Sequence, residues 1–164
     1  MKLMKIIQAE TEKNINDIRS LFREYVHTLN EDLCFQSFED ELAGLPGKYS
    51  PPDGALLLAL SKKGEPAGCV AMRKLEKGIC EMKRLYVRPQ FRGYGLGRKL
   101  AARIIDEAVT LNYTAMLLDT LDRLKAAMVM YESMGFVITE AYYRNPLPGV
   151  VYWKLDLRSI REPE

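Results

Sequence analysis

Glycines and arginines gather in one short run of the sequence. Three glycines stand at alternate positions with an arginine on either side, in the order Arg92, Gly93, Tyr94, Gly95, Leu96, Gly97 and Arg98. Glycine tolerates positive φ and lets the backbone approach a ligand closely, so that free N–H groups can point outward. Together with the positive end of a following helix, these groups form a site suited to phosphate. The alternative is a helix start whose glycines serve only a tight turn.

Two known phosphate-binding patterns do not fit this run. A Walker loop counted from Gly93 needs a second glycine where Arg98 stands. A dinucleotide-binding fingerprint needs Gly-x-Gly-x-x-Gly, and its last position falls on Arg98 or Leu100. What remains is an Arg-x-x-Gly-x-Gly turn at residues 92–97, directly after an expected strand.

This turn and a second motif resemble the GNAT superfamily of acetyl-CoA-dependent N-acetyltransferases. The second motif, 127–136, is similar to the family's Ala-x-x-Leu-Tyr-Glu-x-x-Gly-Phe helix, and the resemblance covers most of the chain, residues 4–157. It implies acetyl-CoA as co-substrate, with its pyrophosphate wrapped by the turn from Arg92 to Arg98. It also implies that the main chain of the preceding strand holds the pantetheine arm, at Leu85, Tyr86 and Val87.

The same resemblance gives Tyr131 a role as general acid. In the family this tyrosine sits near the coenzyme sulfur, where it can protonate the leaving thiolate. A tyrosine suits this step because it keeps its proton at neutral pH. The alternative is a core tyrosine packed beneath its helix, in line with the apolar residues Ala127 and Met134.

Glu81 is the candidate general base. It stands six residues before Val87, the spacing at which histone-modifying relatives carry their base. An acceptor amine must lose a proton to become nucleophilic, and a partly buried carboxylate can take it. The alternative is an ordinary charged residue on a half-exposed strand, paired with Lys83 or with a neighbouring strand. An acyl-carrying Cys80 is disfavoured, because it lies at a core-type position without a histidine partner.

The acceptor site is expected where the resemblance places it, beside the first helical hairpin (residues 29–49) and the last strand connection. Candidate substrate contacts in these two segments are Phe35, Tyr142, Arg144 and Asn145. The tyrosine offers an aromatic wall, and Arg144 could clamp a substrate carboxylate. An exposed hairpin arginine is an equally good interpretation of Arg144.

These residues need strands and helices to position them, and hydrophobic periodicity predicts both. The expected strands are residues 4–9, 55–60, 67–73, 79–87, 115–119, 136–139 and 150–157. Helices are expected from a cap at Asn14 to Leu29, near 39–43, over 95–111 and over 123–134, the last ended by Gly135. In a regular strand Cys80 and Met82 would point to one face, and Leu85 and Val87 to the other. We therefore expect either a β-bulge near Lys83 and Arg84, which would put all four on one face, or a strand that is buried on both faces.

Composition excludes several other classes of protein. The chain has 164 residues, 48% of them hydrophobic and 28% charged, which fits one folded domain over residues 1–164. A net charge of +2 is too weak for a dedicated nucleic-acid binder. No apolar run is long enough to span a membrane and no signal peptide is visible, so we expect a cytoplasmic protein. Three cysteines and one histidine form no zinc motif, so no metal is expected.

The sequence therefore predicts a single-domain α/β (α+β) protein with a mixed, mostly antiparallel sheet of about seven strands and about four flanking helices. Its expected activity is acetyl transfer from acetyl-CoA to the primary amine of an acceptor, by direct attack in a ternary complex. A coenzyme-A-binding sensor or interaction module that lost turnover is the alternative, and a nucleotide-binding regulatory domain is a third. A homodimer is compatible with the sequence. The sequence does not identify the acceptor.

Overall fold

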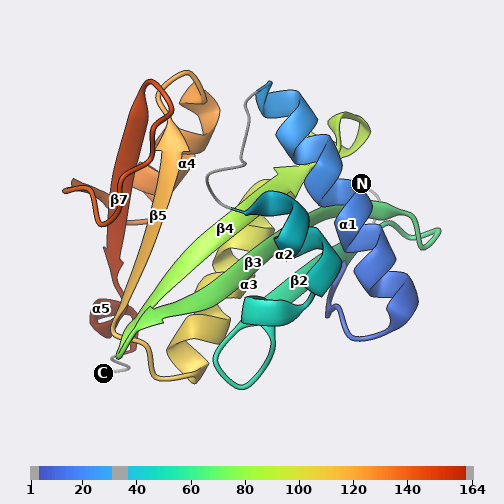
Figure 1. The fold of residues 1–164 in the computed structure, drawn as a ribbon, viewed down its shortest axis with the longest axis horizontal. Coiled ribbons are helices and arrows are strands. Elements are labelled where there is room, and N and C mark those ends of the chain that lie inside the picture. Colours follow the sequence, from blue (N-terminus) through green and yellow to red (C-terminus); the bar gives the residue numbers. More distant parts are fainter. Residues whose placement is uncertain (1–3, 31–36, 162–164) are drawn as a thin grey trace.

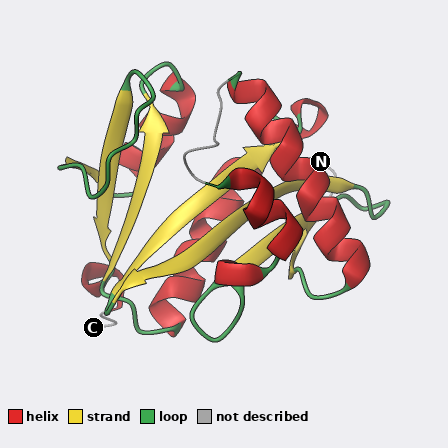
Figure 2. Cartoon of the chain, viewed as in Figure 1, coloured by secondary structure: helices red, strands yellow, loops and turns green. Residues whose placement is uncertain are grey.

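The computed structural model describes residues 4–30 and 37–161, which form one seven-stranded sheet flanked by helices (Figures 1 and 2). The strands are β1 (Lys5–Gln8), β2 (Ala55–Leu60), β3 (Pro66–Glu76), β4 (Ile79–Val87), β5 (Ala115–Leu121), β6 (Val137–Thr139) and β7 (Val150–Asp156). The helices are α1 (Glu12–Leu29), α2 (Phe38–Gly44), α3 (Leu96–Thr110), α4 (Lys125–Ser133) and α5 (Arg158–Arg161), with short 3₁₀ turns η2 (Gly47–Tyr49) and η3 (Pro89–Phe91).

The strand order is β1-β2-β3-β4-β5-β7-β6. Neighbouring strands are antiparallel except β4 and β5, which are parallel because α3 connects them. The predicted fold class, a mixed and mostly antiparallel sheet, is confirmed.

Helices cover both faces of the sheet, and each face has its own hydrophobic core. Helix α3 packs on one face, where Leu100 and Ile104 are fully buried. Helices α1 and α2 cover the other face (Figure 1). Phe22 of α1 and Leu58 of β2 are both buried in the second core there. Burying a leucine, isoleucine or phenylalanine side chain stabilises the fold by about 1.5–3 kcal/mol relative to leaving it exposed. The central strands are therefore held from both sides.

The start of α1 differs from the prediction. The helix is capped by Thr11, whose side-chain oxygen accepts a hydrogen bond of 3.1 Å from the Asn14 N–H. Thr11 is in an extended conformation, as an N-cap residue requires, whereas Asn14 already lies inside the first turn. The prediction that Asn14 caps the helix is wrong because the helix already begins at Glu12, and the N–H of Asn14 is itself capped by Thr11.

Helix α4 ends as its sequence predicts. Gly135 follows the last helical turn with φ of +100°, a conformation that glycine adopts without strain. The helix begins at Lys125 rather than at Arg123. No helix of the described ranges, 4–30 and 37–161, is long and apolar enough to cross a bilayer.

Candidate active site

The sheet opens between β4 and β5. These strands pair over only three positions, from Ile79 opposite Ala115 to Glu81 opposite Leu117, and then diverge toward Val87 and Leu121 (Figure 1). Beyond the pairing, a cavity of about 100 Å³ lies between them, lined by Tyr25, Met82, Lys83, Arg84, Leu85, Leu118, Asp119, Thr120, Leu124, Ala127 and Tyr131. No strand of the described ranges, 4–30 and 37–161, pairs there with the edge of β4 that faces β5, so an extended ligand could hydrogen-bond to it as an added strand would.

A β-bulge sets the direction of β4 at this point. Cys69 pairs with Tyr86 and Ala71 with Lys83, so β4 carries one extra residue between these pairs. Arg84 occupies the bulge with φ of +61°. The bulge is confirmed, and it places four side chains of unlike parity against the α3 core: Cys80, Met82, Leu85 and Val87.

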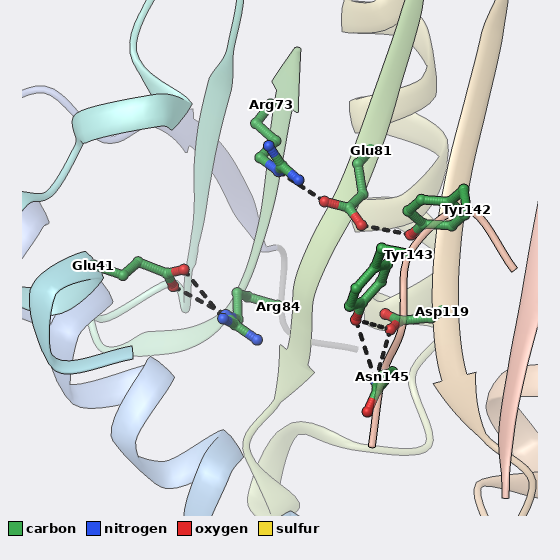
Figure 3. Close-up of polar contacts among 8 residues, drawn as sticks. All are labelled: Glu41, Arg73, Glu81, Arg84, Asp119, Tyr142, Tyr143 and Asn145. Carbon is green, nitrogen blue, oxygen red and sulfur yellow. Dashed lines mark hydrogen bonds and ion pairs between the residues drawn. The ribbon is translucent and has the colours of Figure 1, made fainter. Parts of the chain in front are cut away.

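The bulge residue is held by α2. Arg84 donates from Nε and Nη2 to the two carboxylate oxygens of Glu41, at 3.0 and 3.1 Å (Figure 3). Its guanidinium lies 5.4 Å from the Phe38 ring centroid. Burial lowers the pKa of Arg84, but its hydrogen bonds to Glu41, together with the charge interactions of Glu41, Tyr49 and Tyr25, raise it above its usual value. Arg84 therefore stays charged although it is buried, and it ties α2 to the bulge.

The glycine-rich turn has the conformation that an anion site needs. Gly93 and Gly95 have φ of +87° and +76°, and a Cβ added to either would meet no atom within 4 Å. Gly95 is the N-cap of α3 and, being glycine, brings no side chain that could cap this helix end. Because the turn is open and its N-cap residue leaves the first helical N–H groups to another acceptor, these donors suit an incoming phosphate.

The two arginines of the turn make internal contacts. Arg92 donates from Nε to the Val87 carbonyl at 2.9 Å, and Arg98 donates to the Ser133 hydroxyl of α4 at 2.7 Å. These bonds fasten the turn to β4 on one side and to α4 on the other. Both side chains remain exposed, so they also keep positive charge near the turn.

Tyr131 lies in α4 with its ring in the core. The side chain is 7% exposed, and its ring centroid is 5.5 Å from that of Phe136 and 6.5 Å from that of Trp153. It also lines the cavity between β4 and β5. Burial raises the pKa of Tyr131 well above its usual value, so the phenol keeps its proton. The structure thus combines the two interpretations of this residue, a packed ring and a position beside the cavity.

Glu81 is buried rather than half-exposed. Its side chain is 1% exposed, and its Oε1 accepts a 2.8 Å ion-paired hydrogen bond from Arg73 on β3, while Oε2 accepts one from the Tyr142 hydroxyl (Figure 3). The expectation of a half-exposed strand position is wrong, because α2 and the β6–β7 connection cover this face. The expectation of a pairing with the neighbouring strand is confirmed by Arg73.

Asp119 is a site residue that the sequence analysis did not single out. It lies on β5 and lines the cavity with Tyr131. Its Oδ2 accepts hydrogen bonds from the Tyr143 hydroxyl and from Asn145 Nδ2, the latter at 2.9 Å (Figure 3). Its only signal in the sequence is that it ends the apolar run of a strand, a position that many surface aspartates share.

The β6–β7 connection crosses the mouth of the opening. Tyr142 bonds Glu81 on β4 and Tyr143 bonds Asp119 on β5, so adjacent residues join the two diverging strands. The hydroxyl of Tyr152 on β7 donates to the Tyr143 carbonyl at 2.8 Å, which fastens the connection to β7. Burial raises the pKa of both Tyr142 and Tyr143, and their carboxylate partners raise it further.

The predicted substrate contacts separate in the structure. Tyr142 and Asn145 face the site but use their polar atoms on Glu81 and Asp119 (Figure 3). Arg144 is exposed and does not line the cavity between β4 and β5. Phe35 lies outside the described residues.

The cysteines of the described chain belong to the core. Cys80 is fully buried, and burial raises the pKa of its thiol to about 12. Cys69 is also fully buried, and burial raises its pKa as well. Neither thiol forms the thiolate that an acyl-carrying nucleophile needs near neutral pH. Within residues 4–30 and 37–161, no cluster of three or more His, Cys, Asp or Glu side chains could hold a metal ion.

The sheet opens between two parallel strands, beside a glycine-rich turn suited to an anion and a buried tyrosine, and this arrangement fits a coenzyme-dependent acyltransferase. Residues 15–136 match the model of the acetyltransferase (GNAT) family, and the chain belongs to this family. The protein is therefore an acetyltransferase, of a family that uses acetyl-CoA, and the predicted enzyme class is confirmed.

Known proteins support the assignment over nearly the whole chain. An uncharacterized N-acetyltransferase of Schizosaccharomyces pombe is 44% identical over 94% of this chain and 95% of its own length. The N-acetylaspartate synthetase of Danio rerio is 33% identical over 71% of this chain, which spans 42% of that protein. A solved GNAT-family acetyltransferase of Staphylococcus aureus shares the fold, with a TM-score of 0.79 and 17% identity over 94% of this chain and 99% of that one.

Proposed function

We propose that the protein transfers the acetyl group of acetyl-CoA to a primary amine by direct attack within a ternary complex. The observation that carries this proposal is a pair of neighbouring cavities where β4 leaves β5. The first cavity is lined by Tyr131 and Asp119. The second, of about 280 Å³, is lined by Glu81, and Lys83 lines both. An acid for the leaving group and a base for the amine therefore lie on either side of one junction.

The coenzyme fits the first side of this junction. The unpaired edge of β4 offers backbone groups at Leu85, Tyr86 and Val87 for the amide-rich pantetheine arm. The open turn at Gly93 and Gly95 leads into the start of α3, where free N–H groups would hold the pyrophosphate. When bound, acetyl-CoA supplies an acetyl group activated as a thioester.

Two side chains of the protein handle protons in this proposal. Glu81 accepts the proton of the acceptor amine, because it is the buried carboxylate on the acceptor side, and Arg73 and Tyr142 fix its orientation. Tyr131 holds a proton on its hydroxyl oxygen and donates it toward the leaving sulfur, since its raised pKa keeps it protonated at neutral pH. Asp119 acts as a positioning residue that holds Tyr143 and Asn145 over the opening.

Ligand binding and turnover test the proposal separately. Coenzyme A should raise the melting temperature by mass action, whereas ATP and NADPH should change it little. Thiol release from acetyl-CoA is then followed across a panel of primary amines, with L-aspartate included because the Danio relative is named for its acetylated product. Equal stabilisation by ATP would point to a nucleotide-binding domain instead. Tight coenzyme binding without thiol release from any amine would point to a sensor that has lost turnover.

A further inference from the structure

The second cavity has a chemical character of its own. It lies between the α2–η2 segment and the strands β3 and β4, and its wall consists of Ser37, Glu41, Lys48, Tyr49, Arg73, Glu81, Lys83 and Tyr143. Its volume of about 280 Å³ suits a small metabolite rather than a protein segment. Since Lys83 also lines the cavity that holds Tyr131, a ligand seated here has one end at the junction of the two cavities.

The charges of this cavity favour an anion. Three of its lining residues are basic and two are carboxylates. Both carboxylates already have cationic partners, because Glu41 binds Arg84 through two hydrogen bonds and Glu81 binds Arg73 at 2.8 Å. A ligand therefore meets carboxylates whose charge is already compensated, and Lys48 adds a further cation to the lining.

Arg73 has donors left for a ligand. It donates from Nε to Glu81 (Figure 3), and no residue of the described chain accepts a bond from its Nη1 or Nη2. Its side chain is 25% exposed and lines the cavity. A guanidinium with two terminal N–H groups matches the two oxygens of a carboxylate. Lys48, exposed at the end of η2, brings a second cation from the opposite wall.

The pair of Arg73 and Glu81 also matches a particular substrate head group. The two side chains are in contact, with the cation and the anion side by side on one wall. A molecule that carries an ammonium group next to a carboxylate has the complementary arrangement. Its carboxylate would face the free donors of Arg73, while its nitrogen would face Glu81.

We propose that the acceptor is a primary amine that carries a carboxylate one or two carbons away, as an amino acid does. The carboxylate binds Arg73 and Lys48, and the amine lies beside Glu81 at the junction. This inference rests on the proposed acetyl transfer and names its substrate class. Polycationic amines and amines without a carboxylate are poor acceptors, because they leave Arg73 and Lys48 without a counter-ion.

Isosteric acceptors test this proposal most directly. L-Glutamate, L-glutamine and L-isoglutamine differ only in which carboxylate, if any, is an amide. n-Butylamine represents monocationic amines without a carboxylate, and spermidine represents polycationic amines. We expect kcat/KM for L-glutamate to exceed that for L-isoglutamine by about a hundredfold, because the α-amide cannot pair with Arg73. The ammonium group of L-isoglutamine is more acidic than that of L-glutamate, so more of L-isoglutamine is present as the free amine. This difference favours L-isoglutamine, so a preference for L-glutamate cannot be caused by it.

Variants assign the preference to the cavity. Lys48→Gln removes an exposed cation and should raise KM for L-glutamate about tenfold, with little change for n-butylamine. Arg73→Lys keeps the charge beside Glu81 but removes the two-pronged donor, and it should reduce the preference over L-isoglutamine about tenfold or more. Lys63→Gln, in the exposed β2–β3 turn, makes the same charge change away from the cavity and should have no effect.

Each outcome decides the proposal. Faster turnover of n-butylamine, spermidine or the α-amide overturns the carboxylate preference and leaves acetyl transfer standing. A preference that survives Lys48→Gln and Arg73→Lys overturns the assigned cavity. If no amine is acetylated, the proposed acetyl transfer fails, and melting temperatures with coenzyme A then decide the ligand class. The carboxylate site is then tested by melting temperature alone. A rise with L-glutamate but not with L-isoglutamine, lost in Arg73→Lys, supports the carboxylate site, and equal rises with both compounds overturn it.

Discussion

Replacing Gly95 by aspartate should abolish most of the coenzyme affinity while leaving the protein folded. Gly95 has φ of +76°, and a Cβ there would meet no atom within 4 Å, so the new side chain has room in the free protein. The conformational cost of a non-glycine residue at this φ is about 1–2 kcal/mol, which a domain of ordinary stability tolerates. The effect on binding has a different origin.

A carboxylate at position 95 lies where the turn receives phosphate. Two like charges about 5 Å apart repel by about 1–3 kcal/mol at effective dielectric constants between those of water and of a protein surface. For a pyrophosphate the repulsion sums to about 3 kcal/mol, which corresponds to about a hundredfold weaker Kd. Steric exclusion of the phosphate from the turn adds to this effect.

Gly64 provides a matched control for this substitution. It lies in the β2–β3 turn with φ of +82°, and a Cβ there also meets no atom within 4 Å. Gly64→Asp therefore makes the same charge change as Gly95→Asp at a residue with a similar positive φ and equally open space. Titration calorimetry with coenzyme A gives Kd, and thermal unfolding gives the stability. Wild-type affinity in a folded Gly95→Asp protein, or an equal loss in Gly64→Asp, would refute the phosphate assignment.

Three further perturbations address catalysis and the core. Tyr131→Phe keeps the ring packing on Phe136 and Trp153, so stability should change little while kcat falls about tenfold to a thousandfold; turnover within twofold of wild type would remove Tyr131 from the mechanism. Glu81→Gln should lower kcat about 10²- to 10⁴-fold, whereas Asp119→Asn should lower it less, and the reverse order would make Asp119 the base. Burial raises the pKa of the Cys80 thiol to about 12 in the folded protein, so between about pH 9 and 12 the unfolded chain loses this proton while the folded chain keeps it. The free energy of unfolding should therefore fall by about 1.4 kcal/mol per pH unit in this range because of this group. Cys80→Ala should reduce the pH slope of the unfolding free energy there by about one proton, and an unchanged slope would contradict the burial effect.

Local sequence signals were sufficient for most strands and for the turn. Residues 55–60 and 79–87 are strands with the predicted bounds, because glycine-containing turns separate apolar runs there. The bulge in β4 was predictable because two apolar pairs of opposite parity must share one core. The glycines of the turn were predictable because positive φ is needed at two of them.

The partner of Glu81 depended on an irregularity that the sequence does not announce. A regular two-residue turn at 77–78 would place Glu81 opposite Lys74, but a register shift between Lys74 and Glu76 places Arg73 there instead. The cover over Glu81 comes from Tyr142, a residue 61 positions away, and Asp119 gains its role from Tyr143 and Asn145 in the same way. Such contacts arise from tertiary packing, so neither parity nor spacing along one strand can reveal them.

The short pairing between β4 and β5 has a consequence for the stability of the enzyme. Strands β1–β4 and strands β5–β7 are joined in the sheet by three residue pairs between β4 and β5. Where β4 and β5 diverge, hydrogen bonds from Tyr142 and Tyr143 of the β6–β7 connection link them. A pantetheine arm bound along β4 would extend the pairing between the two halves of the sheet, because it would supply the hydrogen bonds that a neighbouring strand would otherwise make. The backbone amides of residues 85–87 should then exchange with solvent more slowly when coenzyme A is bound than when it is absent. In a cell, the resistance of this enzyme to unfolding and proteolysis would consequently rise and fall with the supply of its own co-substrate.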